Sequence, residues 1–292
     1  MPDGFLLVDK EAGWTSHDVV AKVRSIAGVR KVGHAGTLDP MATGLLVLGV
    51  GKATRLLRFI QELAKTYEAE ALFGVATDSL DADGEELERK PMAVTRSQVD
   101  EAFIALGGDI LQIPPMVSAV KVKGERLHRI ARRGEEVERQ PRPVTIHDIT
   151  VSAFEEGDFP KVKFVTRCGS GTYVRVLADD AAVSLGGRAH LTALRRTKIG
   201  PLSVDDALTV SDLRSRIEDG GPESVVVSLA KGLSHLQARD LDASQVQLVR
   251  NGAPLEASEA DGDGMVRLLD GPDLLAVYRA DGDKLVAEVV LP

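Results

Sequence analysis

The segment GHAGTLDPMATG, residues 33–44, holds one carboxylate, one histidine, three glycines and one proline, and it runs directly into the apolar stretch LLVLGVG. An ionised Asp39 in such a segment could act as a nucleophile, because the glycines let the backbone approach a ligand closely. The same residue also fits a structural role. Pro40 is suited to the first position of a helix, and an aspartate just before it is a typical N-cap. The residues alone leave both roles open, and the two can coexist.

Two other sequence motifs, a phosphate-binding loop and a calcium-binding loop, are only partly matched. The segment GVGKAT is similar to a phosphate-binding P-loop, but Leu46 stands where the motif needs glycine and Ala53 where it needs serine or threonine. The segment DADGE is similar to part of a calcium loop, but Lys90 occupies the position of the final glutamate. We therefore interpret the aspartates of this region as a solvated turn: Asp78, Asp81 and Asp83.

Composition narrows the class of protein. The chain has 292 residues, of which 43% are apolar, so it can bury the core of one large domain or of one domain plus a small one. Its single cysteine, Cys168, excludes an internal disulfide and a cysteine-based zinc site, and no ligand cluster indicates a metal or cofactor. The N-terminus MPDGFLLVDK lacks the features of a signal peptide, and no apolar stretch reaches the ~20 residues of a membrane-spanning helix. We expect a cytoplasmic protein without membrane contact.

Charge is distributed unevenly along the chain. The 36 basic and 44 acidic side chains give a net charge of −8, which by itself argues against a nucleic-acid partner, because phosphates bind lysine and arginine. The stretch 121–142 nevertheless contains eight basic residues against four glutamates, and the last 58 residues hold five basic and eleven acidic side chains. A second basic group comprises Arg188, Arg195, Arg196 and Lys198. Either group alone could be a solvated face.

The elements that must position these residues alternate irregularly between helix and strand. Residues 15–28 predict a helix, capped by Thr15 or Ser16 and ended by Gly28. Residues 65–77 alternate, with Tyr67 on the apolar face, which is typical of a half-buried strand. Further predicted elements are helices over 96–106, after Gly124 and within 172–187, and a strand over 161–168. The varied connections favour an α+β fold with a mixed, largely antiparallel sheet over repeated strand–helix–strand units.

A domain boundary is expected near residue 234, which divides the chain into residues 1–234 and 235–292. After it, we predict a short helix capped by Ser244 and closed at Gly252. Three strand-like runs follow, MVRLLDG, LLAVYRADG and KLVAEVVLP, and the Asp-Gly pairs between them are typical of hairpin turns. The C-terminal part is therefore expected to be a small β-rich domain.

The segment GHAGTLDPMATGLLVLGVGKATR resembles the signature of the TruB-type tRNA pseudouridine synthases of bacteria. Further segments resemble this family in the same order: LLVDKEAGWTSHDVV, AKTYEAEALFGVATDSLDADG, IPPMVSAVKVKGERLHRIARRGEEVERQPRPVTI and CGSGTYVRVLADDAAVSLGGRAHLTALRRTKIGP. Together these blocks cover about residues 4–210. One departure is Glu11, where the family usually has proline after the lysine.

The resemblance implies the pseudouridine synthase fold, with residues 235–292 as a PUA-like domain, and isomerisation of uridine 55 to pseudouridine in the T-arm of tRNA. The N1–C1′ bond breaks, the uracil turns, and it rejoins through C5, with no cofactor or metal. The uridine must first be flipped out of its stack. The resemblance makes Asp39 the catalytic carboxylate and leaves open whether it attacks the sugar carbon or removes a sugar proton.

The resemblance also implies five substrate-binding residues. Tyr67 matches the tyrosine that stacks on the base, and Tyr173 matches the second active-site tyrosine. Arg175 matches the basic partner that orients the carboxylate, and Leu194 matches the apolar residue that lines the pocket. His34 matches the histidine that fills the space of the flipped base. The two basic groups would hold the backbone of the T-stem-loop.

Each of these residues also has a plain structural interpretation. Tyr67 and Leu194 could be core residues. His34 could be an exposed loop residue. Arg175 could form a surface ion pair with Asp179, four residues further along a helix.

Two other kinds of protein fit the scaffold: a non-catalytic RNA-binding or tRNA-folding protein, and the relative that works in a guide-RNA complex. The carboxylate, both tyrosines and the arginine together favour an enzyme. The short acidic C-terminal domain and the lack of basic tails favour one that acts alone. We expect tRNA as the partner, no obligate protein partner, a monomer, and weak RNA binding by the acidic domain.

Overall fold

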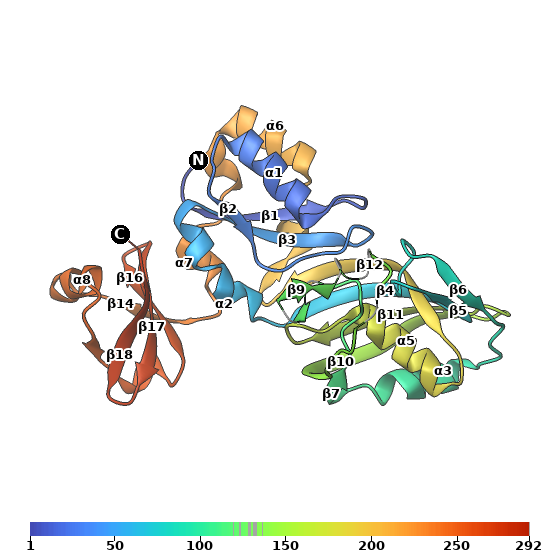
Figure 1. The fold of residues 1–292 in the computed structure, drawn as a ribbon. Coiled ribbons are helices and arrows are strands. Elements are labelled where there is room, and N and C mark those ends of the chain that lie inside the picture. Colours follow the sequence, from blue (N-terminus) through green and yellow to red (C-terminus); the bar gives the residue numbers. More distant parts are fainter. Residues whose placement is uncertain (119, 123, 128–129, 131–132, 136, 292) are drawn as a thin grey trace. The chain divides into compact units, whose positions relative to one another are not determined.

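The computed structural model describes residues 1–118, 120–122, 124–127, 130, 133–135 and 137–291. Contacts divide the chain into two compact units, and Figure 1 follows the chain through both. The first unit comprises Met1–Leu38, Gly44–Glu62 and Gly200–Pro292, and the second comprises Asp39–Thr43 and Leu63–Ile199. This division does not test the predicted domain boundary near residue 234, which stays a prediction.

The second unit is built on five neighbouring antiparallel strands. Their order is β12 (Ala189–Ile199), β4 (Lys65–Phe73), β11 (Lys161–Cys168), β10 (Arg142–Glu155) and β7 (Gly108–Gln112). The predicted alternation along β4 is confirmed, because Ala69, Ala71 and Phe73 are buried while the residues between them are more exposed. Side chains directly opposite each other on such strands share a face.

Two helices pack on this sheet. Helix α3 (Arg96–Ile104) contacts β10, helix α5 (Val174–Ser184) contacts β12, and the two helices contact each other (Figure 1). The ring of Phe103 on α3 packs against Phe73 of β4 and Phe164 of β11, with centroids 6.5 Å and 4.7 Å away. Helix α5, whose first turn carries two of the predicted site residues, is held by its contacts with β12 and with α3.

Two hairpins complete the second unit. Strands β5 (Val75–Thr77) and β6 (Glu86–Arg89) are joined by the loop 78–85, in which Leu80 has a positive φ of 62°. Strands β8 (Lys121–Val122) and β9 (Glu125–Arg126) form a short second hairpin. The helix predicted after Gly124 and three members of the basic stretch lie largely or wholly outside the described residues: Lys123, Arg129 and Arg132.

The first unit contains β1 (Gly4–Lys10), which pairs antiparallel with β3 (Thr43–Val50), and β2 (Val32–His34), which also pairs with β3. Helix α1 (Ser16–Ala27) is capped by Thr15, one of the two predicted residues, and it ends at Gly28 in the left-handed conformation, as predicted. Further elements of the first unit before residue 237 include α2 (Leu57–Gln61), β13 (Leu202–Ser203), α6 (Val210–Gly220) and α7 (Leu229–Gly232).

Residues 237–290 form a second sheet. Its order is β14 (Gln237–Asp240), β16 (Met265–Asp270), β17 (Asp273–Asp281), β18 (Lys284–Val290) and β15 (Leu255–Glu256), with β14 and β16 parallel and the other pairs antiparallel. The predicted hairpin turns are confirmed, because Gly271 and Gly282 take the positive φ that such two-residue loops need.

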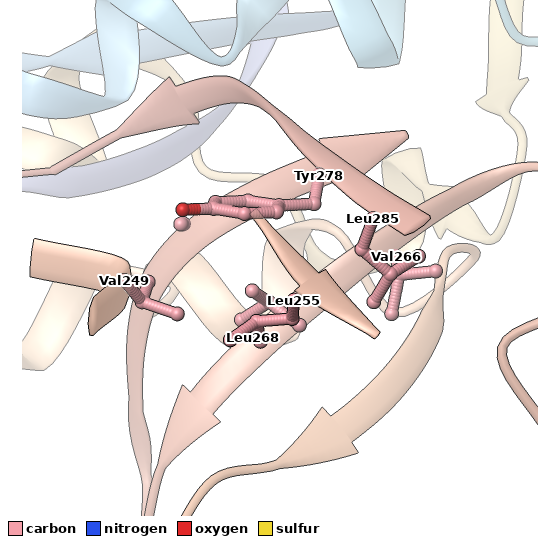
Figure 2. Close-up of a cluster of buried hydrophobic side chains, with 7 residues drawn as sticks. Val249, Leu255, Val266, Leu268, Tyr278 and Leu285 are labelled. Carbon is pink, nitrogen blue, oxygen red and sulfur yellow. The ribbon is translucent and has the colours of Figure 1, made fainter. Parts of the chain in front are cut away.

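Helix α8 (Ala243–Arg250) packs on this C-terminal sheet. The prediction that Ser244 caps it is wrong: Asp242 is the N-cap and accepts from the backbone N–H groups of Ser244 and Gln245. Figure 2 shows the apolar core between α8 and the strands: Val249, Leu255, Val266, Leu268, Ala276, Tyr278 and Leu285.

These elements confirm the predicted α+β class with a mixed, largely antiparallel sheet and a β-rich C-terminal region. Among the described residues, no helix is both long and apolar enough to cross a membrane.

Candidate active site

Asp39 lies in a turn, without a helix after it. The backbone N–H of Ala42 donates to the Asp39 carbonyl over 3.1 Å, and strand β3 begins at Thr43. The N-cap interpretation of Asp39 and Pro40 is therefore wrong. The apolar run that follows is buried at nearly every position, which is typical of a strand covered on both faces.

The Asp39 carboxylate is paired with Arg175, from the first turn of α5. The Nε of Arg175 lies 3.2 Å from Oδ2 of Asp39. The Arg175 side chain is only 3% exposed, whereas the Asp39 side chain is 34% exposed. The pair thus joins a buried guanidinium to a carboxylate that keeps access to solvent.

The other nitrogens of Arg175 are held inside the second unit. Its Nη1 donates to Asp81 Oδ2 and to the Ser79 carbonyl, both at 2.8 Å, and its Nη2 donates to the Val117 carbonyl at 2.9 Å. The predicted alternative, a surface pair with Asp179, is wrong, because Asp179 instead accepts two hydrogen bonds from Arg188. Four acceptors from three loops therefore fix the plane of the guanidinium.

Asp81 is a site residue that the sequence did not reveal. The interpretation of Asp78, Asp81 and Asp83 as a solvated turn is wrong for Asp81, whose side chain is 5% exposed. Its carboxylate also accepts from the Ser79 hydroxyl and from the Asp83 backbone. No local pattern separates it from its two neighbours, since its partner Arg175 lies 94 residues further along the chain.

The two carboxylates on Arg175 differ in accessibility. Asp81 is enclosed and serves to hold the arginine, while Asp39 presents part of its carboxylate to the outside. A carboxylate held in a fixed orientation by a guanidinium can attack an electrophilic carbon or accept a proton from a bound ligand. Of these two carboxylates, only Asp39 has the exposure that a reacting group would need, while Asp81 holds the arginine from inside.

Tyr67 lies on β4 directly opposite Arg196 on β12. The Arg196 side chain is hydrogen-bonded to the Tyr67 hydroxyl and is only 1% exposed. Burial raises the pKa of Tyr67 above its usual value, and Arg196 opposes this rise. The phenol therefore stays protonated at neutral pH and is suited to stacking and to hydrogen bonding.

Tyr173 is the N-cap residue of α5. Burial raises the pKa of its hydroxyl, and the nearby Ser118 opposes the rise. The charge of Asp39 acts on the hydroxyls of both Tyr173 and Tyr67. Both phenols consequently lie within electrostatic reach of the accessible carboxylate.

Leu194 is buried on β12, opposite Ala69. Because Tyr67 and Ala69 are two residues apart on one strand, and Leu194 and Arg196 two apart on the next, all four side chains share a sheet face. Leu194 is therefore both a core residue and a neighbour of the tyrosine, so the structural and the functional interpretations of it are compatible.

His34 belongs to the first unit, at the end of β2. Its Nδ1 accepts from the Gly36 N–H at 3.3 Å, and its ring meets His17 edge-on with centroids 5.9 Å apart. The ring is half-buried rather than fully exposed. Its predicted role in replacing a flipped base stays a prediction.

The second basic group is only partly a solvated face. Arg196 is buried against Tyr67, and Arg188 is paired with Asp179, so two of its four members are held within the second unit. Lys198 is exposed. Within the described part of the chain, no group of three or more His, Cys, Asp or Glu side chains is arranged to hold a metal ion.

Cys168, the last residue of β11, lies in register with Lys65 of β4, two residues before Tyr67. The side chain is 1% exposed, and burial raises the pKa of its thiol to about 11. A thiol in this state is a packing residue and a poor nucleophile.

Known proteins resemble the whole chain. A curated tRNA pseudouridine synthase B from Thermobifida fusca is 48% identical over 273 residues, covering 90% of this chain and 89% of the relative. The protein of the same name from Geotalea uraniireducens is 43% identical, covering 95% and 92%.

A solved Cbf5–Nop10–Gar1 complex contains a chain that is 26% identical, with a TM-score of 0.74, and the match covers 99% of this chain and 84% of that one. The family model for the N-terminal domain of TruB family pseudouridylate synthases matches residues 24–174, which contain Asp39, Tyr67, Asp81 and Tyr173. These findings confirm the predicted pseudouridine synthase fold. The chain belongs to the TruB family of pseudouridylate synthases.

Proposed function

We propose that this protein converts uridine 55 to pseudouridine in the T-arm of tRNA. Membership of the TruB family and relatives called tRNA pseudouridine synthase B support the reaction and the tRNA substrate. The observation that carries the proposal is the Asp39 carboxylate, which is oriented by Arg175 yet remains 34% exposed. The T-arm position follows from the resemblance of the signature segment around Asp39.

The reaction is an isomerisation, so atoms balance without a co-substrate. The N1–C1′ bond of the uridine breaks, the uracil turns, a C5–C1′ bond forms, and the hydrogen on C5 is released to solvent while N1 gains a proton. Asp39 acts either by attack on C1′ or by removal of a sugar proton. Both routes need the ionised carboxylate, and Arg175 keeps it aimed at the ribose.

The base-binding pocket is proposed to consist of Tyr67, Tyr173 and Leu194. Tyr67 stacks on the flipped uracil, and base–aromatic stacking of this kind contributes about 1–3 kcal/mol. Leu194 extends the same sheet face with an apolar surface, and the Tyr173 hydroxyl lies close enough to sense the Asp39 charge. His34 is proposed to fill the space that the uridine leaves in the RNA.

The remaining parts of the proposal concern partners and domains. Exposed basic residues hold the T-stem-loop backbone, residues 1–234 form the catalytic domain, and residues 235–292 form a PUA-like domain that binds RNA weakly because it is acidic. The solved complex contains Nop10 and Gar1 beside Cbf5. The present chain is proposed to act alone, as a cytoplasmic monomer without cofactor.

The test is tritium release from a tRNA transcript labelled at C5 of uridine. The purified wild-type protein should release tritium from position 55 and leave a transcript with cytidine at that position untouched. Asp39→Asn should lower the turnover number by at least about 1000-fold, because the amide can neither attack nor accept a proton. Its matched control is Asp83→Asn, which makes the same change on an exposed side chain and should turn over normally.

Measuring tRNA binding together with tritium release distinguishes the proposed enzyme from a non-catalytic tRNA-folding protein. If the wild type bound the transcript without releasing tritium, the chain would be a binding protein on the same scaffold. If Asp39→Asn kept its turnover, the carboxylate would not be the reacting group.

A further inference from the structure

The first turn of α5 carries Tyr173 and Arg175, but it lacks the usual means of fixing a helix start. Tyr173 is the N-cap residue, and its side chain makes no capping hydrogen bond. In a capping box, the side chain three residues later accepts from the N-cap N–H, but that residue is Val176. The preceding segment, residues 169–172, is GSGT, and Gly171 has a positive φ of 87°. Local sequence therefore leaves the position of Tyr173 weakly defined.

A side chain from a distant strand supplies what the helix lacks. The Oε1 of Gln112 accepts from the Tyr173 N–H at 2.8 Å, and its Nε2 donates to the Tyr173 carbonyl at 3.1 Å. Gln112 is the last residue of β7, it is 1% exposed, and it is 61 residues away in sequence. Its backbone is fixed by pairing with Arg142 of β10.

The side-chain amide of Gln112 thus hydrogen-bonds both backbone polar groups of Tyr173, as a neighbouring strand would. We call this pair of hydrogen bonds the clamp. The Tyr173 carbonyl also accepts from the N–H groups of Val176 and Leu177, which are the first hydrogen bonds of α5. The clamp therefore sets the position of Tyr173 and the direction in which the helix starts. Arg175 follows two residues later, and its orientation depends on that start.

We propose that Gln112 is a positioning residue for pseudouridine formation, which sets Tyr173 and, through the first turn of α5, the arginine that orients Asp39. The proposal rests on the proposed function. A serine, threonine or aspartate at position 173 would cap the helix locally. Since that position holds a tyrosine that faces the substrate, the anchoring groups must come from elsewhere in the fold, and the buried amide of Gln112 provides them.

The test compares two variants of similar shape. Gln112→Met keeps the volume and loses both hydrogen bonds, so the turnover number should fall by about 10- to 100-fold while the KM for tRNA changes little. Gln112→Glu can make both bonds only when it is protonated, and burial raises the pKa of such a carboxyl. Its turnover relative to wild type should therefore rise as the pH falls from 8 to 6, while the ratio for Gln112→Met stays flat.

If Gln112 had a role in packing alone, these differences between the two variants should not be observed. Wild-type turnover in Gln112→Met, or equal and pH-independent losses in the two variants, would overturn the proposal. Circular dichroism and thermal unfolding check that both variants fold, and if Gln112→Met does not, the pH response of Gln112→Glu decides.

Failure of the proposed function gives a different result. If the wild type releases no tritium at all, that function is wrong, and the clamp is then judged by amide hydrogen exchange. Exchange in the segment 169–177 should be faster in Gln112→Met than in wild type, and equal exchange would overturn the inference about Gln112 as well.

Discussion

The sheet of the second unit and the C-terminal sheet have different interiors, since the first contains buried charged side chains and the second is apolar. The second unit buries several charged side chains, each at most 7% exposed: Lys65, Asp81, Arg175, Asp179 and Arg196. The C-terminal core is apolar, and the one polar group it contains, the Tyr278 hydroxyl, donates to the Ala253 carbonyl. Because the C-terminal sheet is held by apolar packing, buried charge is not a general requirement of such sheets, and its presence in the second unit indicates a specific reason there.

Buried charge alone does not mark a site, as Asp261 illustrates. It is 3% exposed in the C-terminal region, where it accepts from Arg239 and from Ser258. The bonds from Ser258 close a local turn, and the bond from Arg239 joins that turn to β14. The Arg175 cluster differs because one of its two carboxylates, Asp39, remains accessible. The combination of an enclosed cation and a partly open anion is what distinguishes the site.

The largest expected effect comes from removing Asp81, the enclosed carboxylate of the Arg175 cluster. Asp81→Ala leaves the Arg175 charge buried without its closest partner, which should lower the free energy of unfolding by roughly 4 kcal/mol and also reduce turnover. Urea unfolding and tritium release measure the two effects. The control Asp83→Asn should change stability by less than about 0.5 kcal/mol. If Asp81→Ala and Asp83→Asn had the same free energy of unfolding and the same turnover, Asp81 would have no supporting role.

A cavity in the C-terminal core should have a somewhat smaller effect and a different consequence. Leu268 is fully buried there, so Leu268→Ala should cost roughly 3 kcal/mol of local stability. Hydrogen exchange across residues 265–290 measures that loss. Turnover of the folded enzyme should stay unchanged, as it should in the control Leu248→Ala, where the side chain is 47% exposed. A parallel loss of turnover would show that the apolar sheet contributes to catalysis.

The smallest effect concerns Asp180 on α5, whose pKa is raised to about 6 by burial and then by the charge of Asp179. The folded state thus binds a proton more tightly than the unfolded chain does, so the contribution of Asp180 to wild-type stability falls as the pH rises from about 4 to about 6. Asp180→Asn removes this cost. Allowing for partial solvent screening, the variant should be about 1–2 kcal/mol more stable at pH 8 and equal to wild type near pH 4. Urea unfolding at both pH values checks this, and a variant that is less stable at pH 8 would contradict it.

Local chemistry made the elements predictable from sequence. The start of α1 was predicted to within one residue, at Thr15 or Ser16, and its end at Gly28, the alternation of β4 and the turns at Gly271 and Gly282 were predicted correctly. Each of these depends on residues within a few positions of one another. The cap of α8 was misplaced by two residues because Asp242 and Ser244 are both good N-cap residues, and only the structure decides between them.

The site was predictable only where the resemblance supplied it. Arg175 was paired with Asp39 on that basis, and the structure has the pair. The partners that hold the arginine and the tyrosine were not identified: Asp81 was interpreted as part of a solvated turn, and Gln112 was not singled out. Hydrogen bonds across 94 and 61 residues leave no local pattern. At Pro40 a local pattern gave a wrong prediction. The residue fits the start of a helix, but the buried apolar run after it forms a strand.

The sequestered thiol of Cys168 has a practical consequence for these experiments. It is the chain's only sulfhydryl, it is almost inaccessible, and its pKa of about 11 keeps it as an unreactive thiol at neutral pH. A cysteine introduced on the surface would therefore react selectively with a maleimide dye, without prior removal of the native residue. Fluorescently labelled protein made in this way would report tRNA association in real time while the interior of the second unit keeps its native composition.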